Sequence, residues 1–218
     1  MNEMDRTNID HPKKKFALLF AILEFVFFAL FYFSQDSHIN HTLIFHIYIF
    51  TAPVIIVILI WAIPELRKKV KSLLATKDLI IFVAVLSIWL YVYDVQHIGV
   101  SSVFSFLYYP VILEELNFRF IVIEFLKNYT SDGKAIICQA LMYTLFYASF
   151  VIFYPNGYPG LYAPLFILDN FAMAIIYGAI YYLRKNIYLT TALHLSFYLL
   201  LVFLPLDLGW LGYVTTPV

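Results

Sequence analysis

The sequence predicts an all-α fold, a polytopic transmembrane helical bundle of about seven spans. The 218 residues are 63% hydrophobic and only 13% charged, with a mean hydropathy of +0.84. Such a composition leaves too little polar surface to coat a water-soluble globule of this size. Apolar runs also recur at lengths near the 20 residues that a helix needs to cross a bilayer. Finally, the basic residues gather in alternate connections, as cytoplasmic loops do.

Seven apolar runs are long enough to be spans. They are Phe16–Phe33, Thr42–Ile63, Leu79–Val95, Val103–Leu126, Ala135–Tyr154, Leu161–Leu183 and Ile187–Leu204. The first run is interpreted as a retained anchor, because it ends without the small-residue cleavage motif of a signal peptide. The short connections carry Asn, Asp, Gly and Pro, which are turn residues. Since no repeat or long linker interrupts them, residues 1–218 are expected to form a single membrane-embedded domain.

The distribution of charge predicts the orientation and excludes one class of partner. Thirteen of the 14 basic residues precede the first span or follow the second, fourth and sixth spans. The N-terminus is therefore expected in the cytoplasm and the C-terminus outside, in a multi-pass protein of the cell membrane. Acidic and basic residues balance at 14 each, and no basic tract is dense enough for a nucleic-acid partner. The lipid bilayer is the partner that the composition indicates.

The remaining basic residue, Arg119, lies inside the fourth span together with Glu114 and Glu115. An ionisable side chain at the centre of a membrane helix costs about 3 kcal/mol on insertion scales, so this cluster predicts a functional site at membrane depth. On an α-helix Glu115 and Arg119 share a face, whereas Glu114 points about 100° away from Glu115. Arg119 is expected to pair with Glu115, which leaves Glu114 free to accept a proton. The same residues also fit a buried ion-pair network that ties helices together.

The pattern Glu-Glu-x-x-x-Arg on a transmembrane helix resembles the first motif of the CAAX-protease and bacteriocin-processing (CPBP) family, which includes the type II CAAX prenyl endopeptidases. The resemblance continues through a span that contains Gly178, a short basic turn, and a last helix that carries His194. It covers residues from about 110 to about 198. It implies an intramembrane endopeptidase in which a glutamate-activated water hydrolyses a peptide bond.

The resemblance also implies roles for single residues. Glu114 takes the position of the base, Glu115 and Arg119 take supporting positions, and His194 lies on the oxyanion side. Tyr198 stands where the family has an asparagine four residues after this histidine. These five residues form the expected catalytic set.

Two positions depart from the family pattern. Phe146 to Phe150 align with the second motif, so Phe150 replaces the histidine that helps to activate water. A phenylalanine ring can neither accept a proton nor orient a water. Tyr198 replaces an amide with a phenol, which can still donate a hydrogen bond but reaches farther. Turnover is therefore expected to be weak, and whether the chain is an enzyme stays open.

Three functions remain open at this point. The first is the weakened intramembrane endopeptidase. The second is a non-catalytic relative that binds a peptide or a membrane protein, such as a bacteriocin self-immunity protein. The third is a small ion or proton transporter in which Glu24, His46, Glu114 and Arg119 form a path.

Cofactor sites and other isolated residues carry weaker signals. No metal is predicted, because zinc hydrolases show three protein ligands and here only one glutamate of the doublet and His194 converge. No cofactor is predicted, since the sequence holds no nucleotide-binding glycine motif. Cys138 is expected to be a buried, inert thiol. His38, His41 and His97 are expected to be solvated residues on the external side, with cation binding or pH sensing as the other interpretation.

Overall fold

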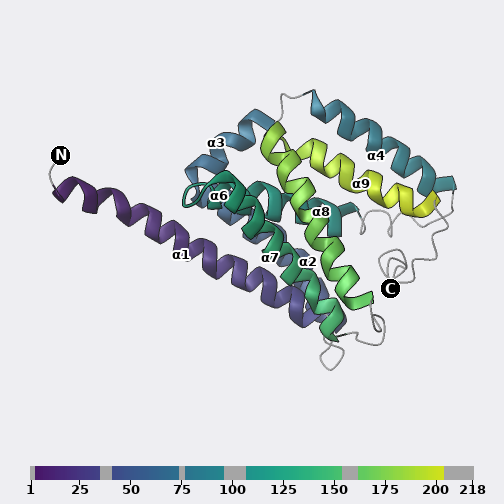
Figure 1. Cartoon of the computed structure of the whole chain (residues 1–218), viewed down its shortest axis with the longest axis horizontal. Helices are drawn as coiled ribbons and strands as arrows, with labels where there is room; N and C mark the ends of the chain where they lie inside the picture. The colour runs from purple at the N-terminus through teal and green to yellow at the C-terminus, as the bar shows by residue number, and fades with distance from the viewer. Residues whose placement is uncertain (1–2, 35–40, 74–76, 96–106, 154–161, 204–218) are drawn as a thin grey trace. The chain divides into compact units, whose positions relative to one another are not determined.

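The computed structural model describes residues 3–34, 41–73, 77–95, 107–153 and 162–203. These residues are helical with short turns and contain no β-strand, which confirms the predicted all-α fold (Figure 1). Among the described helices, three are long and apolar enough to cross a membrane, and a bent pair of helices supplies a fourth span if it is counted as one. One of the three is Phe16–Phe33, with the bounds that the sequence predicted. The finer count of seven spans stays a prediction.

Contacts divide the chain into two compact units, residues 1–70 and 71–218. In the first unit, α1 (Glu3–Ser34) packs along α2 (His41–Ala62). The ring of Tyr48 on α2 meets two rings of α1 edge to face, Phe27 at 5.4 Å and Phe31 at 5.5 Å between centroids. All three rings are fully buried. Such aromatic pairs add about 0.5–1.5 kcal/mol each beyond the area that they bury.

The chain turns sharply after α2. The next helix, α3 (Pro64–Leu73), begins at a proline, and the two helix axes differ by 104°. Proline suits the first position of a helix, because its fixed φ matches the helix and its missing N–H would have no partner there. The basic segment that the sequence placed in a connection is therefore helical.

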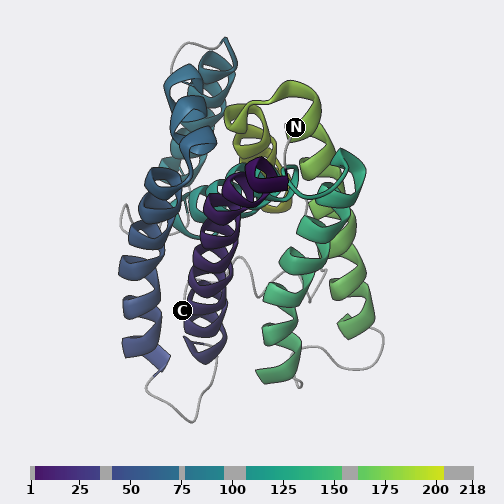
Figure 2. The same cartoon turned by 90° about the vertical axis from the view of Figure 1, so that its left-hand side faces the viewer.

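The second unit contains two pairs of neighbouring helices and a segment that contacts both pairs. Helix α4 (Asp78–Val95) packs on α9 (Ile187–Phe203), and α7 (Asp132–Phe153) packs on α8 (Tyr162–Arg184), as Figures 1 and 2 show. Residues 115–122 contact α7, α8 and α9. Their side chains are accordingly buried, except for a partly exposed Leu116. The acidic doublet and Arg119 therefore lie in the interior of this unit.

The fourth predicted span is not a regular α-helix. It consists of the π-helices η1 (Leu107–Ile112) and η2 (Glu115–Val122), followed by one turn of α-helix, α6 (Ile123–Leu126). Pro110 lies within η1 and has no N–H to donate to the helical hydrogen-bond ladder. Glu114 keeps α-helical geometry, but Glu115 and Arg119 lie in η2, so the regular α-helix expected for this pair is wrong. Such π segments are frequent at functional sites.

Helix α9 begins after a tight turn. Lys185 has a positive φ of 53°, and its N–H donates to the carbonyl of Tyr181, which ends α8. The side chain of Asn186 then accepts a hydrogen bond of 2.9 Å from the N–H of Tyr188 and caps the start of α9. This cap fixes the start of the helix that carries His194 two turns later.

Helix α7 corrects the expectation for the single cysteine. Cys138 is exposed, on the same side as the exposed Ile137, Leu141 and Leu145. The opposite side carries the buried Gln139, Tyr143 and Tyr147 and faces the unit's interior. Cys138 is therefore not the buried thiol that the sequence predicted, because the helical period places it on the apolar outer side of α7.

Candidate functional site

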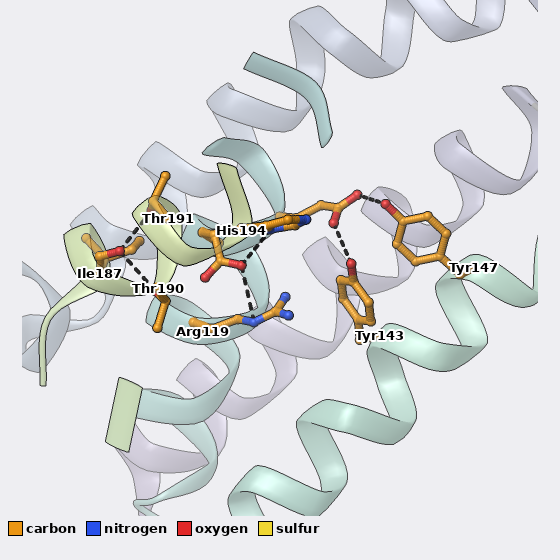
Figure 3. A network of polar contacts seen from close by, with 9 residues as sticks. Arg119, Tyr143, Tyr147, Ile187, Thr190, Thr191 and His194 are labelled. Atoms are coloured by element: carbon orange, nitrogen blue, oxygen red, sulfur yellow. Dashed lines mark hydrogen bonds and ion pairs between the residues drawn. The ribbon is translucent and has the colours of Figure 1, made fainter. Parts of the chain in front are cut away.

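The candidate site joins the acidic doublet to α7 and α9. Glu114, Glu115 and Arg119 are fully buried, and His194 is 3% exposed. Charged groups in such surroundings are costly unless they are paired. Figure 3 shows that the side chains of α7 and of α9 approach the doublet from two different sides.

Glu115 is held by two partners at a single oxygen. Its Oε1 lies 3.0 Å from Nδ1 of His194 and 3.5 Å from Nε of Arg119 (Figure 3). The pairing of Glu115 with Arg119 agrees with the expectation from their spacing. The structure also brings His194, 79 residues along the chain, onto the same carboxylate. His194 thus contacts the second glutamate of the doublet.

Glu114 is held by two phenols from α7. The hydroxyl of Tyr143 donates to Oε2 at 2.9 Å, and the hydroxyl of Tyr147 donates to Oε1. The two tyrosines are four residues apart and therefore share one face of their helix. The sequence analysis expected Glu114 to be free, but each of its carboxylate oxygens accepts a hydrogen bond.

The sequence analysis missed both tyrosines as site residues. A signal was present, since Tyr143 and Tyr147 are spaced i,i+4 on the span that follows the acidic doublet. The signal is weak because the chain contains 18 tyrosines and 22 phenylalanines, so two phenols in an apolar span do not stand out. Hydrogen-bond partners inside a membrane domain are what distinguish these two phenols.

A third tyrosine and the ring of Tyr143 enclose the cationic side of the site. The guanidinium carbon of Arg119 lies 4.4 Å from the ring centroid of Tyr143 and 5.4 Å from that of Tyr177 on α8. The ring of Tyr177 also lies 5.3 Å from the imidazole of His194. A desolvated cation–π contact contributes about 2 kcal/mol, so these rings help to fix the position of Arg119.

The two positions that depart from the family pattern differ in what the structure shows. Phe150 stacks on Tyr147, with ring centroids 5.7 Å apart and planes tilted by 21°, and meets Phe166 edge to face. An apolar ring thus packs against the phenol that holds Glu114. Tyr198 belongs to α9, but its side chain lies outside the part of the chain that the structure describes.

An apolar cavity of about 150 Å³ lies beside the segments that carry Glu115 and His194. Its lining consists of Phe82, Ile112, Leu116, Ile187, Tyr188 and Thr191. Leu116 follows Glu115 in the π-helix, and Thr191 precedes His194 by one turn of α9. The hydroxyls of Thr190 and Thr191 both donate to the carbonyl of Ile187 within α9 (Figure 3). The cavity therefore offers apolar surface next to the charged cluster.

The other residues singled out from the sequence lie elsewhere or cannot be placed. Glu24 is buried on α1 and His46 is exposed on α2, both in the first unit. His38, His97 and the side chain of His41 lie outside the described residues. Within the described ranges, no three or more histidine, cysteine or acidic side chains are grouped so that they could hold a metal ion.

The comparison with protein families identifies the segment that contains this site. The family model described as type II CAAX prenyl endopeptidase Rce1-like matches residues 95–200. The matched residues make up a little under half of the chain. The Rce1-like segment includes the acidic doublet, all of α7 and α8, and His194. No curated protein and no solved structure matches the chain.

The match to the Rce1-like family model confirms, for residues 95–200, the resemblance that was based on the acidic doublet. The family is one of membrane-embedded proteases, which implies a bilayer environment and peptide substrates. The bilayer environment agrees with the apolar helices of the described chain.

Proposed function

We propose that this chain is an intramembrane endopeptidase of weakened activity, in which Glu114 activates the water that hydrolyses a peptide bond. It would be a multi-pass protein of the cell membrane, with about seven spans and a cytoplasmic N-terminus. The observation that carries the proposal is the arrangement of the doublet: Glu114 and Glu115 are buried side by side, each with its own partners. A buried ion-pair network alone would need only Glu115 and its cationic partners.

The hydrolytic step assigns the base role to Glu114. A water that displaces one of the phenols can donate a hydrogen bond to the vacated carboxylate oxygen. Its oxygen then attacks the carbonyl carbon of the peptide bond while the proton passes to Glu114, which later returns it to the departing amine. Tyr143 or Tyr147, whichever stays in place, keeps the carboxylate oriented.

Glu115, the second glutamate of the doublet, orients the side chain of His194. Because Nδ1 of His194 bonds Glu115, the orientation of the imidazole ring beside the doublet is fixed. Arg119 holds the other flank of Glu115. Glu115 and Arg119 are therefore positioning residues in this proposal.

The weak turnover follows from the surroundings of Glu114. Phe150 packs against Tyr147 and has no group that could share the proton of a water. A positioned acid or base typically contributes about 10²–10⁴-fold to a rate, so its loss leaves slow hydrolysis. The apolar cavity beside the site would accept an apolar side chain of the substrate.

A second candidate is a non-catalytic relative that binds a peptide or a membrane protein, such as a bacteriocin self-immunity protein. The observation that favours it is that both oxygens of Glu114 already accept hydrogen bonds from phenols. A water must displace a buried hydrogen bond before it can be activated. Peptide binding in the cavity requires no such displacement.

One experiment separates the two candidates. The purified protein is reconstituted in liposomes with a library of apolar peptides, and both peptide binding and cleavage are measured, the latter by mass spectrometry. Glu114→Gln is expected to abolish cleavage and keep binding, while the matched control Glu65→Gln, on the exposed side of α3, changes neither. Equal cleavage by wild type and Glu114→Gln would refute the proposal. Binding without any cleavage by the wild type would establish the second candidate.

A further inference from the structure

The amino groups of Arg119 have no hydrogen-bond partner among the described residues. The side chain is fully buried, and neither Nη1 nor Nη2 contacts an acceptor there. Its anchor is on the other edge of the guanidinium, where Nε lies 3.5 Å from Glu115. Arg119 therefore has one edge that is held and one edge that is available.

An available guanidinium edge in a buried site points to a ligand oxygen. Buried polar groups nearly always have partners, and an unmet donor costs about 1–3 kcal/mol, more when it is charged. The planar fork of arginine matches groups that present negatively charged oxygen. The aromatic rings of Tyr143 and Tyr177 near this guanidinium restrict its motion and offer no oxygen acceptor from their faces.

The position of this edge relative to Glu114 suggests which oxygen it would bind. The guanidinium lies over the ring of Tyr143, and the hydroxyl of the same ring donates to Glu114. Figure 3 shows the terminal nitrogens of Arg119 on the side of Tyr143. One phenol ring thus separates the available donors from the carboxylate that would activate water.

We propose that the amino groups of Arg119 form an oxyanion-binding site, which makes Arg119 a catalytic residue in addition to a partner of Glu115. The inference rests on the proposed hydrolysis. As the water oxygen bonds to the carbonyl carbon and its proton passes to Glu114, the electron pair of the C=O bond moves to the carbonyl oxygen. Nη1 and Nη2 donate hydrogen bonds to that oxygen until the C–N bond breaks and the carbonyl re-forms.

The test compares ligands that do and do not carry such an oxygen. Three leucine-rich octapeptides are titrated into the protein in lipid nanodiscs. The first has a phosphinate in place of its central peptide bond, the second an N-methylated amide at the same place, and the third is the phosphinate peptide with a carboxamide C-terminus. The variant is Arg119→Lys, which keeps the charge that pairs with Glu115 and lacks the fork. The matched control is Arg67→Lys on α3.

Arg119→Lys is expected to weaken binding of both phosphinate peptides about 10²-fold, in line with the loss of an oxyanion donor, and to leave the N-methylated peptide within about threefold. Equal weakening of all three peptides would overturn the inference and assign Arg119 a structural role. A loss confined to peptides with a free carboxylate would also overturn it, because the partner would then be the peptide C-terminus.

A measurement on the wild-type protein keeps the inference testable if Arg119→Lys does not fold. The chain has few arginines, so ¹⁵N-arginine labelling resolves the side chain of Arg119 by nuclear magnetic resonance. Its Nη signals are expected to shift with the phosphinate peptide and to stay in place with the N-methylated one; identical spectra would contradict the inference. These binding data need no turnover. A chain that cleaves nothing but prefers phosphinate would refute the proposed function alone, whereas cleavage without that preference would refute the oxyanion site alone.

Discussion

The hydroxyl of Tyr143 donates a 2.9 Å hydrogen bond to Oε2 of Glu114. The two residues belong to different helical segments, 29 positions apart, and both are buried. Together with Tyr147, which serves the other oxygen, this contact joins the acidic doublet to α7. The stability of the second unit and the chemistry of Glu114 therefore depend on the same phenols.

Removal of the Tyr143 hydroxyl should lower stability. Tyr143→Phe leaves a buried carboxylate oxygen without its donor, which is expected to reduce the free energy of unfolding by about 1–3 kcal/mol. Thermal unfolding in nanodiscs measures the change. The matched control is Tyr91→Phe at an exposed tyrosine of α4, where a shift within about 0.5 kcal/mol is expected. Equal melting of both variants would show that the hydrogen bond contributes nothing.

Glu115 and His194 should be energetically coupled. A double-mutant cycle of Glu115→Gln and His194→Asn is expected to give a coupling energy of about 1–3 kcal/mol, because both side chains are buried and in direct contact. The same cycle on Glu124 and Lys127, a partly exposed pair at 3.4 Å, should give less than about 1 kcal/mol. Similar coupling energies for the two pairs would show that burial does not strengthen the contact between Glu115 and His194.

A side chain at Gly178 should be destabilising. A Cβ atom there would lie 2.9 Å from Oε1 of Gln139 and 3.1 Å from Cγ2 of Ile136, where α8 meets α7. Gln139 is fully buried, so its amide must repack among buried neighbours, and Gly178→Ala is expected to cost about 1 kcal/mol. Gly133 has open space, so Gly133→Ala should be neutral or stabilising by up to about 1 kcal/mol. Chemical unfolding of both variants measures the two changes in stability, and equal changes would contradict the prediction.

The turn between α8 and α9 gives a prediction about the backbone. Lys185 has a φ of 53° and its ammonium lies 3.6 Å from the ring centroid of Tyr182. Lys185→Gly and Lys185→Ala both lose this contact, but only glycine adopts a positive φ without strain. The glycine variant should be more stable than the alanine variant by about 1 kcal/mol in thermal unfolding. An equal or reversed order would show that the turn relaxes to another conformation.

The sequence predicted the last two helices closely because long apolar runs fix where they begin and end. Predicted Leu161–Leu183 became Tyr162–Arg184, and predicted Ile187–Leu204 became Ile187–Phe203. The acidic doublet and Arg119 were identified for a similar reason, since charges are rare inside such runs. These features depend on local sequence alone.

The side-chain contacts of the site could not be predicted, because they depend on how separate helices pack against one another. The contact of Tyr147 with Glu114 requires the rotation of α7 about its axis, and a single sequence does not fix this rotation against another helix. The contact of His194 with Glu115 requires the register of α9 in the same way. The π-helical turns had one local signal, Pro110 in η1, but a proline also permits a simple kink. Packing decided between these outcomes.

The 104° turn at Pro64 has a consequence for how the first unit would meet lipid. Wherever α2 runs along the bilayer normal, α3 must run nearly parallel to the membrane plane. Arg67 and Lys68 are exposed there, and each basic residue near an anionic leaflet contributes about 1 kcal/mol of attraction. Helix α3 would then be an interfacial helix on the headgroups, and it would set the depth at which α2 enters the hydrocarbon.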